Sequence, residues 1–572
     1  MREKTIYDPN CKNIRELVYS AAKRYPENLA FKYKDSIKSP VKDVTFTQMI
    51  ENLEALGTQL MIEGFSGGPI GIIGANSYPW YNCFLAAVCG GSIAVPMDAG
   101  FTAEELESSI MRSEIRILFY GDKHEKLVEE VKSRGNISTV EKFVRITGEN
   151  NPYEEMIVAG KKAMEEGNLE YRNAVIDEKA LAVLLFTSGT TSTSKAVMLS
   201  QYNIVSNCID MYEYELFYST DVNMAFLPFH HSFGLVGCMV FLCVGACSVF
   251  CDGLKYVSKN LQDYRVTVFV GVPLLVENMY KKIIKEVEKK GMVKKVNLGR
   301  KICAVLDKFG IHKRRQIFAE IINQLGGGLR LIICGAAPLA GDVVQGLNDF
   351  GILTIQGYGL TETSPVLCAE SHIYQKAGSV GKPMPRVELV IDNPDDDGIG
   401  EIVVKGPNVM LGYLNQPEET ASVLSEDGWF RTGDLGMVDK DGYVWIRGRS
   451  KNVIVMKNGK NIFPEEIEAH IDQLPYVEES MVFTTEKHNE FVLWAKMVYS
   501  ESYLKDNKMT EEELRAQAGR DIEAINSIMP QFKQVKHFII TTEPMIKTTT
   551  QKVKRNLEIA KTMKELEEKG WA

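Results

Sequence analysis

The chain has 572 residues, which exceeds one ordinary domain of roughly 100–200 residues. Hydrophobic residues make up 45% and charged residues 25%, values close to the globular average that argue against a disordered or fibrous chain. The formal net charge of −9 argues against a general nucleic-acid binder, which usually carries a basic surface, so we expect no nucleic-acid partner.

The cysteine pattern and the N-terminus predict a cytoplasmic protein. The 11 cysteines form no CxxC pair, and free thiols are typical of a reducing compartment. The first ten residues lack the apolar core of a secretory signal. The apolar run 235–251 is shorter than the ~20 residues of a membrane-spanning helix, so we expect it to be buried core.

Apolar runs alternate with helical patterns through about the first 440 residues. This alternation is typical of α/β layering with buried sheets. The runs predict strands in the segments 69–74, 92–96, 181–186, 330–334 and 352–356.

From about Val387 short alternating runs such as 401–405 are divided by Gly, Asn and Asp turns, which predicts antiparallel β-structure. After Arg449 short helices and strands return over about 120 residues, enough for a small α+β domain. We therefore predict an α/β N-terminal domain, residues 1–448, built of layered α/β subdomains plus a small β-rich subdomain. A small α+β domain, residues 449–572, follows it.

The segment Lys281–Arg315 holds 13 Lys and Arg against 3 Asp and Glu, a local charge of +10 in an otherwise acidic chain. Its apolar residues lie at roughly helical spacing, so we predict an amphipathic basic helix; they are Leu298, Ile302, Val305, Leu306 and Phe309. One interpretation is a solvated helical face. The other is a docking site for something anionic, either a membrane surface or an acidic protein.

Two segments that follow predicted strands carry groups suited to a nucleotide. Residues 187–195 are hydroxyl-bearing, small or glycine positions ending in a lysine, and such a loop can present N–H groups, hydroxyls and an ammonium to a polyphosphate. In 356–363 a Tyr between glycines can stack on a base and a Glu can hold Mg²⁺. A flexible surface loop and a plain strand-to-helix turn are the respective alternatives.

Three later segments are weak when each is taken alone. In 428–434 an Asp held by a Gly turn could accept both hydroxyls of a ribose, although a hairpin turn has the same composition. Segments 448–468 and 547–555 are also explained by solvated turns and charge runs.

In their order and spacing these segments resemble the superfamily of adenylate-forming enzymes, which includes acyl-CoA synthetases, luciferases and the adenylation domains of peptide synthetases. The resemblance covers essentially the whole chain. Segment 326–338 and the basic insertion before it look most like the long-chain fatty acyl-CoA synthetase branch. The resemblance implies that the C-terminal domain is mobile about a hinge near 449–452, at Lys451.

The resemblance also implies which residues bind the cofactors ATP and Mg²⁺. The phosphates of ATP are expected at Thr187, Ser188, Gly189, Thr190, Thr191 and Lys195. The adenine is expected at Gly335, Ala336, Ala337, Tyr358 and Gly359. The ribose is expected at Asp434 and Arg449.

The catalytic residues that the resemblance implies are Lys552, Thr361, Glu362 and His231, with Glu362 as the Mg²⁺ ligand. Lys552 matches the lysine that reaches the α-phosphate and the substrate carboxylate during adenylation. The acceptor tunnel is expected at Gly459, Lys460 and Asn461. The phosphate loop departs from the usual Gly-x-Pro-Lys-Gly of the family, yet no departure removes a charged group.

The activity implied is conversion of a medium- or long-chain fatty acid and ATP to acyl-AMP and pyrophosphate, followed by transfer of the acyl group to the thiol of CoA. One alternative acceptor is the phosphopantetheine thiol of an acyl carrier protein. Another alternative is a non-catalytic relative that binds nucleotide or lipid, against which the charged residues Lys195, Glu362, Asp434 and Lys552 argue. The basic segment Lys281–Arg315 suggests a further hypothesis, that the protein makes peripheral contact with an anionic membrane.

Overall fold

The computed structural model of the chain describes residues 5–187, 194–456, 461–487, 490–547, 553–568 and 570. These residues form two compact units. The larger unit comprises Met1–Thr187, Ser194–Glu388 and Val404–Phe430, and the smaller one Leu389–Val403 and Arg431–Ala572, each without the residues outside the described ranges. The predicted α/β class with a large N-terminal and a small C-terminal part is confirmed. The exact boundary between 448 and 449 stays a prediction.

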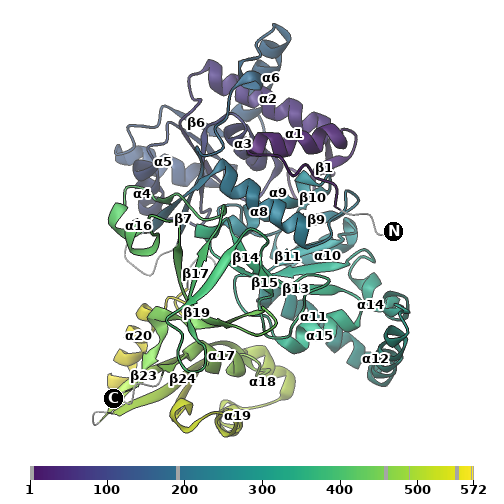
Figure 1. The fold of residues 1–572 in the computed structure, drawn as a ribbon, viewed down its shortest axis with the longest axis vertical. Helices are drawn as coiled ribbons and strands as arrows, with labels where there is room; N and C mark the ends of the chain where they lie inside the picture. Colours follow the sequence, from purple (N-terminus) through teal and green to yellow (C-terminus); the bar gives the residue numbers. More distant parts are fainter. Residues whose placement is uncertain are drawn as a thin grey trace. The chain divides into compact units, whose positions relative to one another are not determined.

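A nine-stranded sheet lies in the larger unit (Figure 1). In pairing order its strands are β15 (Lys382–Pro383), β14 (Val366–Ala369), β13 (Leu353–Gly359), β12 (Leu331–Cys334), β11 (Val268–Gly271), β9 (Val222–Ala225), β10 (Cys247–Phe250), β1 (Leu29–Tyr33) and β2 (Lys42–Thr45). The strands from β13 to β1 pair in parallel, and the strands at both margins pair antiparallel.

The larger unit contains a second, seven-stranded sheet. In pairing order its strands are β18 (Gly412–Tyr413), β8 (Lys195–Ser200), β7 (Leu181–Thr187), β4 (Ile93–Met97), β3 (Pro69–Ile73), β5 (Ile117–Tyr120) and β6 (Lys142–Arg145). β8 pairs antiparallel with both β7 and β18, whereas the other pairs are parallel.

Helices cover both sheets, as expected for parallel strands that are buried on both faces. The helices of the larger unit are α1 (Ile14–Arg24), α2 (Phe46–Ile62), α3 (Tyr78–Val88), α4 (Ala103–Ser113), α5 (Glu125–Arg134), α6 (Pro152–Glu165), α7 (Glu170–Asn173), α8 (Gln201–Tyr214), α9 (Ser232–Cys243), α10 (Val257–Asp263), α11 (Pro273–Lys289), α12 (Val293–Lys308), α13 (Arg314–Ile317), α14 (Ala319–Gln324), α15 (Gly341–Asp349) and α16 (Pro417–Val423).

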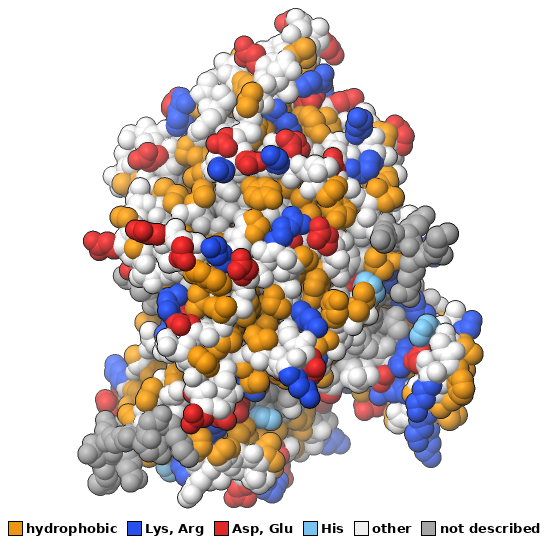
Figure 2. Space-filling view, viewed as in Figure 1, with side chains coloured by type: hydrophobic (Ala, Val, Ile, Leu, Met, Phe, Trp, Pro, Cys, Tyr) orange, Lys and Arg blue, Asp and Glu red, His pale blue; other side chains and the backbone are white. Residues whose placement is uncertain are grey.

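Local sequence signals fix these elements. All four residues of β5 and of β11 are buried, as their uninterrupted apolar sequences predict. Thr45 caps α2 with a reciprocal Gln48 contact, and Ser77 caps α3 through the N–H of Trp80. Charged side chains of both signs lie interspersed on the surface (Figure 2).

The smaller unit is built of sheets that contain both antiparallel and parallel strand pairs, and of four helices within its described residues. In pairing order its four-stranded sheet is β16 (Glu388–Asp392), β17 (Gly400–Lys405), β19 (Phe430–Val438) and β20 (Val444–Arg449). Further strands are β21 (Ile454–Val455) with β22 (Asn461–Ile462), and β23 (Val477–Lys487) with β24 (Glu490–Tyr499) and β25 (His537–Thr541). Its helices are α17 (Pro464–Ile471), α18 (Glu501–Asn507), α19 (Glu511–Ile528) and α20 (Arg555–Glu568).

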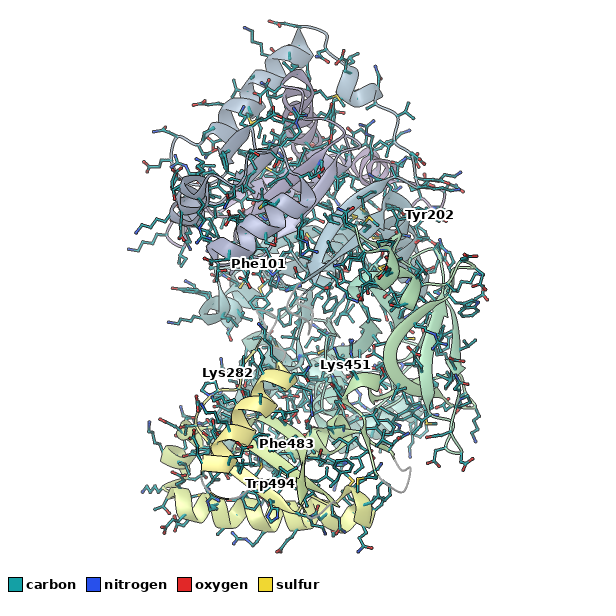
Figure 3. All side chains as sticks on the ribbon, turned by 90° about the vertical axis from the view of Figure 1, so that its left-hand side faces the viewer. Phe101, Tyr202, Lys282, Lys451, Phe483 and Trp494 are labelled. Carbon is teal, nitrogen blue, oxygen red and sulfur yellow. The ribbon has the colours of Figure 1, made fainter. Side chains whose placement is uncertain are left out.

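The smaller unit has its own hydrophobic core. Phe483 and Trp494 lie opposite each other in β23 and β24, with ring centroids 6.4 Å apart (Figure 3). They pack with Met481, Val498 and Leu566, so α20 closes over this face of the sheet. A separate core of this kind is what a domain needs in order to fold independently.

The five strand predictions are confirmed, because the apolar runs form strands. The segments 69–74, 181–186 and 330–334 correspond to β3, β7 and β12.

All eleven cysteines are free thiols, and all but Cys251 are buried. Among the described residues, none of the helices is long and apolar enough to cross a bilayer.

Candidate active site

Most candidate residues of the larger unit follow the ends of neighbouring parallel strands. β9, β11, β12 and β13 pair in parallel, so their carboxyl ends meet at one edge of the sheet. β9 leads to His231, β12 leads to 335–337, and β13 contains Tyr358 and leads to Thr361 and Glu362. Open α/β sheets bind ligands at this edge.

The loop after β12 opens to solvent. Gly335 is buried, whereas Ala336 and Ala337 are exposed. Ala336 has a φ of 73°, in the left-handed region that favours glycine. Such strain costs on the order of 1–3 kcal/mol and gathers at ligand sites. A Cβ at Gly335 would lie 3.1 Å from the ring of Phe233, so the loop packs against the start of α9.

The turn that carries Glu362 is fixed by close backbone contacts. A Cβ at Gly359 would lie 1.8 Å from the carbonyl oxygen of Pro365, so this position accepts only glycine. The backbone N–H of Met410 donates a hydrogen bond of 2.8 Å to the carbonyl oxygen of Glu362. The backbone of Glu362 is therefore held by a segment almost fifty residues further along the chain.

Tyr413 joins Glu362 to Lys195. Its hydroxyl donates to Glu362 Oε1 at 3.0 Å, and Lys195 Nζ lies 4.6 Å from the centroid of its ring. The pairing of β18 with β8 sets Tyr413 opposite Val197, which explains this proximity. Lys195 Nζ also lies 2.6 Å from Glu419 Oε2. A carboxylate and an ammonium are thus brought within reach of one aromatic residue.

Ser232, the residue after His231, contacts the candidate catalytic residue Thr361. The Ser232 hydroxyl donates to Thr361 Oγ1 at 3.4 Å. His231 is the N-terminal cap residue of α9, and its carbonyl oxygen accepts from the N–H of Leu235 at 3.0 Å. His231 and Glu362 are thus each the sequence neighbour of one partner in the Ser232–Thr361 hydrogen bond.

His231 belongs to a polar group with His230 and Asp98, in which Asp98 is buried and both histidines are partly buried. Their ligand atoms lie within 4.8 Å of one another, and His230 Nε2 is 3.4 Å from Asp98 Oδ1. Burial lowers the pKa of His230, although Asp98 opposes this shift, so the neutral imidazole is favoured. A neutral imidazole beside a carboxylate can orient a polar substrate or ligate a metal ion.

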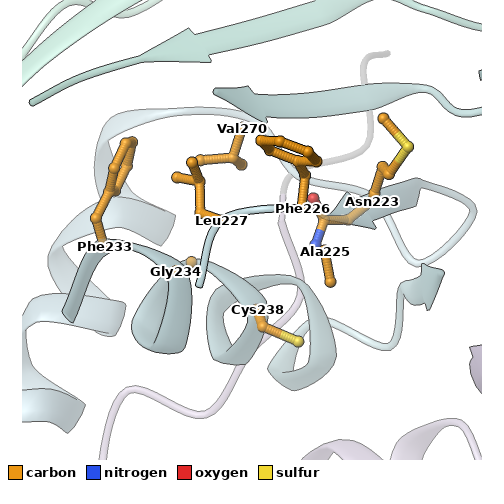
Figure 4. Close-up of a pocket in the computed structure, with 10 residues that line it drawn as sticks. Asn223, Ala225, Phe226, Leu227, Phe233, Gly234, Cys238 and Val270 are labelled. Atoms are coloured by element: carbon orange, nitrogen blue, oxygen red, sulfur yellow. The ribbon is translucent and has the colours of Figure 1, made fainter. Parts of the chain in front are cut away.

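A small apolar pocket lies between α9 and the strands β9 and β11 (Figure 4). Its volume is about 10 Å³, close to the space that one water molecule needs. A Cβ at Gly237 would lie 3.9 Å from Val270 Cγ1, an ordinary van der Waals distance, so this helical position has room for a Cβ. The residues that line the pocket are Asn223, Met224, Ala225, Phe226, Leu227, Phe233, Gly234, Gly237, Cys238 and Val270.

The apolar segment 235–251 is core, as expected, and touches this pocket only at its start. Cys243 and Cys247 are buried in it, and burial raises the pKa of both thiols. Protonated thiols among apolar side chains favour packing over metal binding.

In the smaller unit, the two predicted ribose residues contact each other. Asp434 and Arg449 are register partners in β19 and β20, and Arg449 Nε lies 2.7 Å from Asp434 Oδ1. The Asp434 carboxylate is almost fully buried, while the Arg449 side chain stays partly exposed. The N–H of Asp434 donates to Thr432 Oγ1 at 3.1 Å, which fixes the backbone at this point.

Two further candidates lie in short elements of the smaller unit. Lys451 is exposed in the 3₁₀ turn Ser450–Asn452. Asn461 begins β22, pairs with Val455, and lines a surface pocket together with Arg431 and Phe463.

The chain on both sides of the predicted Lys552 is anchored. Lys547 forms an antiparallel bridge with Val553, and the N–H of Lys554 donates to the carbonyl oxygen of Ile546 at 2.7 Å. The N–H of Ile546 donates to Glu558 Oε2 at 2.9 Å, at the start of α20. Both ends of this segment are therefore held together.

A buried ion pair supports that anchor. Lys496 Nζ, on β24, lies 2.8 Å from Glu558 Oε1 and donates to Thr562 Oγ1 at 3.1 Å. Burial would raise the pKa of Glu558, but the contacts with Lys496 and Ile546 hold the pKa below its usual value. The carboxylate form of Glu558 is therefore the one that fastens α20 to the sheet.

Some predicted residues lie outside the described part of the chain: Ser188, Gly189, Thr190, Thr191, Gly459, Lys460 and Lys552. Of the predicted phosphate loop the structure describes Thr187, whose hydroxyl donates to the carbonyl oxygen of Lys195 at 3.3 Å. Sequence reasoning missed Tyr413, Ser232 and Asp98. No local motif marks these residues, since each is recognisable only through contacts with distant parts of the chain.

The fold and these clustered lysine, carboxylate and histidine groups are those of an α/β enzyme with a site at the strand ends. A family model described as AMP-binding enzyme matches residues 18–414, and a model described as AMP-binding enzyme C-terminal domain matches residues 451–569. The chain belongs to the AMP-binding enzyme family.

Curated relatives have names that refer to fatty acids. The chain is 30% identical over 464 residues to long-chain-fatty-acid–CoA ligase 5 of Rattus norvegicus, covering 75% of this chain and 67% of the relative. It is 27% identical over 488 residues to a long-chain-fatty-acid–CoA ligase of Mycobacterium tuberculosis, covering 82% and 80%. A chloroplastic long-chain-fatty-acid–[acyl-carrier-protein] ligase of Arabidopsis thaliana is 24% identical and covers 97% of this chain and 86% of its own.

Solved structures support the fold. ATP-bound MatB from Rhodopseudomonas palustris matches with a TM-score of 0.73 at 23% identity, covering 96% of this chain and 98% of its own. A fatty acyl CoA synthetase of Mycobacterium tuberculosis matches with a TM-score of 0.63 at 21% identity, covering 97% and 99%.

Proposed function

We propose that the chain activates a medium- or long-chain fatty acid with ATP and transfers the acyl group to the thiol of CoA. In the first step a carboxylate oxygen attacks the α-phosphorus, the bond to the β-phosphate breaks, and pyrophosphate leaves. In the second step the thiol sulfur attacks the acyl carbonyl, AMP leaves, and the thiol proton goes to solvent. This is the chemistry of an acid–thiol ligase.

The observation that carries the proposal is the contact of Tyr413 with both Lys195 and Glu362. It gathers an ammonium and a carboxylate around one aromatic side chain. ATP needs such a combination, because its phosphates are anionic and its reaction requires a divalent cation. The names of the curated relatives, which are long-chain-fatty-acid–CoA ligases, suggest a fatty acid as the acid and CoA as the thiol.

The residues present fit Mg²⁺. Glu362 offers a carboxylate and Thr361 a hydroxyl at the same turn, and Mg²⁺ is usually bound by one or two carboxylates together with substrate phosphates. When bound, Mg²⁺ neutralises charge on the phosphates. The hydroxyl of Tyr413 orients the Glu362 carboxylate, and Lys195 attracts the β- and γ-phosphates.

His231 and Ser232 are proposed to orient the fatty acid carboxylate beside Thr361. The apolar pocket next to them would receive the first carbons of the acyl chain. Because the pocket has only about 10 Å³, a longer chain must displace side chains such as Phe226 or Phe233. Packed aromatic rings can rotate aside, so this displacement is compatible with binding.

Lys552 is proposed as the lysine that stabilises charge at the α-phosphate during adenylation. The mobile C-terminal domain, hinged at Lys451, then presents Gly459, Lys460 and Asn461 to the thiol acceptor. Asp434 and Arg449 are proposed to bind the ribose. The described residues on either side, Lys547 and Val553, form an antiparallel bridge, and Ile546 is held by Glu558.

A carrier-protein thiol is the second candidate acceptor. The relative named as an acyl-carrier-protein ligase matches 97% of this chain, at 24% identity. Both acceptors present the same phosphopantetheine thiol, so the first step is identical for them.

One assay separates these candidates. Pyrophosphate release is measured with acids of increasing chain length, and thioester formation is then measured with CoA and with phosphopantetheinylated carrier protein. We expect acid-dependent pyrophosphate release and thioester on CoA. If thioester forms only on carrier protein, the acceptor is carrier protein rather than CoA. If pyrophosphate release does not depend on the acid, the proposal is refuted.

A further inference from the structure

The helix α12 exposes an apolar face that nothing among the described residues covers. Leu298, Ile302, Val305 and Phe309, which we call the α12 stripe, are between 44% and 75% exposed. They recur at intervals of four, three and four residues, so they occupy one side of the helix, roughly 60° wide at 3.6 residues per turn. Hydrophobic side chains lie exposed over α12 in Figure 2. Isolated exposed apolar residues need no explanation, but a continuous stripe does.

The opposite side of α12 is fastened to the larger unit. Val296 and Cys303 are buried in the hydrophobic core, and a Cβ at Gly299 would lie 3.1 Å from the ring of Phe318. This contact leaves no room for the helix to turn its stripe inward. The exposure is therefore fixed by packing on the other side.

Ion pairs hold the same orientation. Arg300 Nε lies 3.5 Å from Asp349 Oδ2, and Arg314 lies 2.8 Å from Asp307 and 2.9 Å from Asp349. These arginines therefore stabilise the packing of α12 and α13 within the larger unit. The basic charge that remains for a partner comes from the lysines.

Lysines flank the stripe on both sides. At 3.6 residues per turn, Lys294, Lys301 and Lys308 lie along one border and Lys295 along the other. All four are exposed, and none of them forms an ion pair with a residue that the structure describes. A narrow apolar stripe bordered by lysines is the pattern of a helix that lies in a membrane interface.

We propose that α12 docks on an anionic lipid bilayer, with the α12 stripe inserted among the acyl chains and the flanking lysines at the headgroups. Two observations favour a bilayer over an acidic protein. The stripe is uninterrupted by polar residues, and the lysine stems can extend along it while their charges stay in water. The segment Lys281–Arg315 also carries a formal charge of +10, which an anionic surface attracts as a whole.

The consequence for catalysis rests on the proposed function: a docked enzyme would take fatty acid from the bilayer. The docking itself does not depend on that function. Vesicle binding can therefore fail or succeed independently of acyl activation, which is measured in parallel with a soluble short-chain acid and CoA.

The test is cosedimentation with vesicles of phosphatidylcholine alone and of phosphatidylcholine with about one third phosphatidylserine. The charge variant is Lys294→Gln/Lys301→Gln/Lys308→Gln, and the stripe variant is Leu298→Ser/Phe309→Ser. The control is Val158→Ser/Val175→Ser, which removes two exposed apolar side chains elsewhere. Circular dichroism establishes that each variant is folded.

We expect the charge variant to bind anionic vesicles on the order of 100-fold more weakly at low salt, about fivefold per lysine, with a smaller difference at high salt. The stripe variant should lose binding at every salt concentration, because it removes inserted apolar area. The control should bind like the wild type, and all variants should activate the soluble acid normally.

Wild-type binding by both variants would overturn the proposal. So would a loss of thioester formation on carrier protein without loss of vesicle binding, since the surface would then serve a protein. A stripe variant that converts a dimer to a monomer in sedimentation would assign the stripe to a second copy of the chain and would overturn the docking on lipid as well.

Discussion

Two lysine–glutamate pairs, one in each compact unit, have similar lengths but opposite surroundings. Lys195–Glu419 measures 2.6 Å with side chains 26% and 55% exposed, and Lys496–Glu558 measures 2.8 Å with side chains 2% and 0% exposed. Water and salt compete with the first pair, which therefore contributes about 0–1 kcal/mol and can yield to a phosphate. The second pair has no such competitor. Exposure, rather than residue type, separates a lysine that can bind from one that supports the fold.

The largest expected effect comes from breaking the buried pair. Lys496→Met leaves the Glu558 carboxylate buried without its cation, so the unfolding free energy of the smaller unit should fall by about 3–5 kcal/mol. Urea unfolding, followed by the fluorescence of the Phe483–Trp494 region, measures this change. A loss below about 1 kcal/mol would show that the pair is not structural.

The matched control is Lys195→Met in the exposed pair. Its unfolding free energy should change by less than about 1 kcal/mol. Its ATP-dependent activity should nevertheless fall sharply, because the methionine offers no charge to the phosphates. If Lys195→Met and Lys496→Met lower the unfolding free energy equally, the exposed and the buried pair do not differ in their contribution to stability.

Tyr413→Phe sharpens the account of the exposed site. It removes the hydroxyl that donates to Glu362 and keeps the ring beside Lys195. A hydrogen bond to a charged group contributes about 1.5–3 kcal/mol, so kcat/KM for ATP should fall roughly 10- to 100-fold. Tyr413→Leu, which also removes the ring, should be worse. Identical kinetics of wild type and Tyr413→Phe would contradict the role of this hydroxyl.

Gly237→Leu tests the apolar pocket. The new side chain would grow into the space next to Val270, so kcat/KM should fall roughly tenfold more for long acids than for short ones. Gly519→Leu, at a helical glycine with similar room in the smaller unit, is the control. A uniform loss over all chain lengths would place the acyl chain elsewhere.

A last prediction, on the pH dependence of stability, concerns a buried carboxyl outside the site. Burial raises the pKa of Asp210 to about 7 despite its contact with Arg386. Since the folded-state pKa lies above the unfolded one, the associated stability is present below pH ~4 and is lost as the pH rises to ~7. Asp210→Asn should flatten this decline by on the order of 1 kcal/mol per pH unit. An unchanged slope in urea unfolding from pH ~4 to ~7 would contradict the shift.

Much of the fold was predictable, because buried parallel strands need uninterrupted apolar runs. The runs at 69–74 and 330–334 became β3 and β12 for this reason, and the glycine-rich turns after Val387 became antiparallel hairpins. The order of the elements also indicated the family.

The contacts within the candidate site were not predictable. Tyr413 meets Lys195 only because β18 pairs with β8, two strands more than 200 residues apart. The bond from Ser232 to Thr361 joins segments 129 residues apart. Sequence spacing marks residues near one another in the chain, whereas these contacts depend on how the strands are ordered in their sheets.

The most direct test of the account is the two half-reactions of Lys552→Ala. Fatty-acid-dependent pyrophosphate release should fall on the order of 10²–10³-fold, the usual effect of removing one group that stabilises transition-state charge. Thioester formation from ready-made acyl-adenylate should stay close to the wild-type rate, because the lysine acts only in the first step. Equal losses in both steps, or an undiminished first step, would contradict the account.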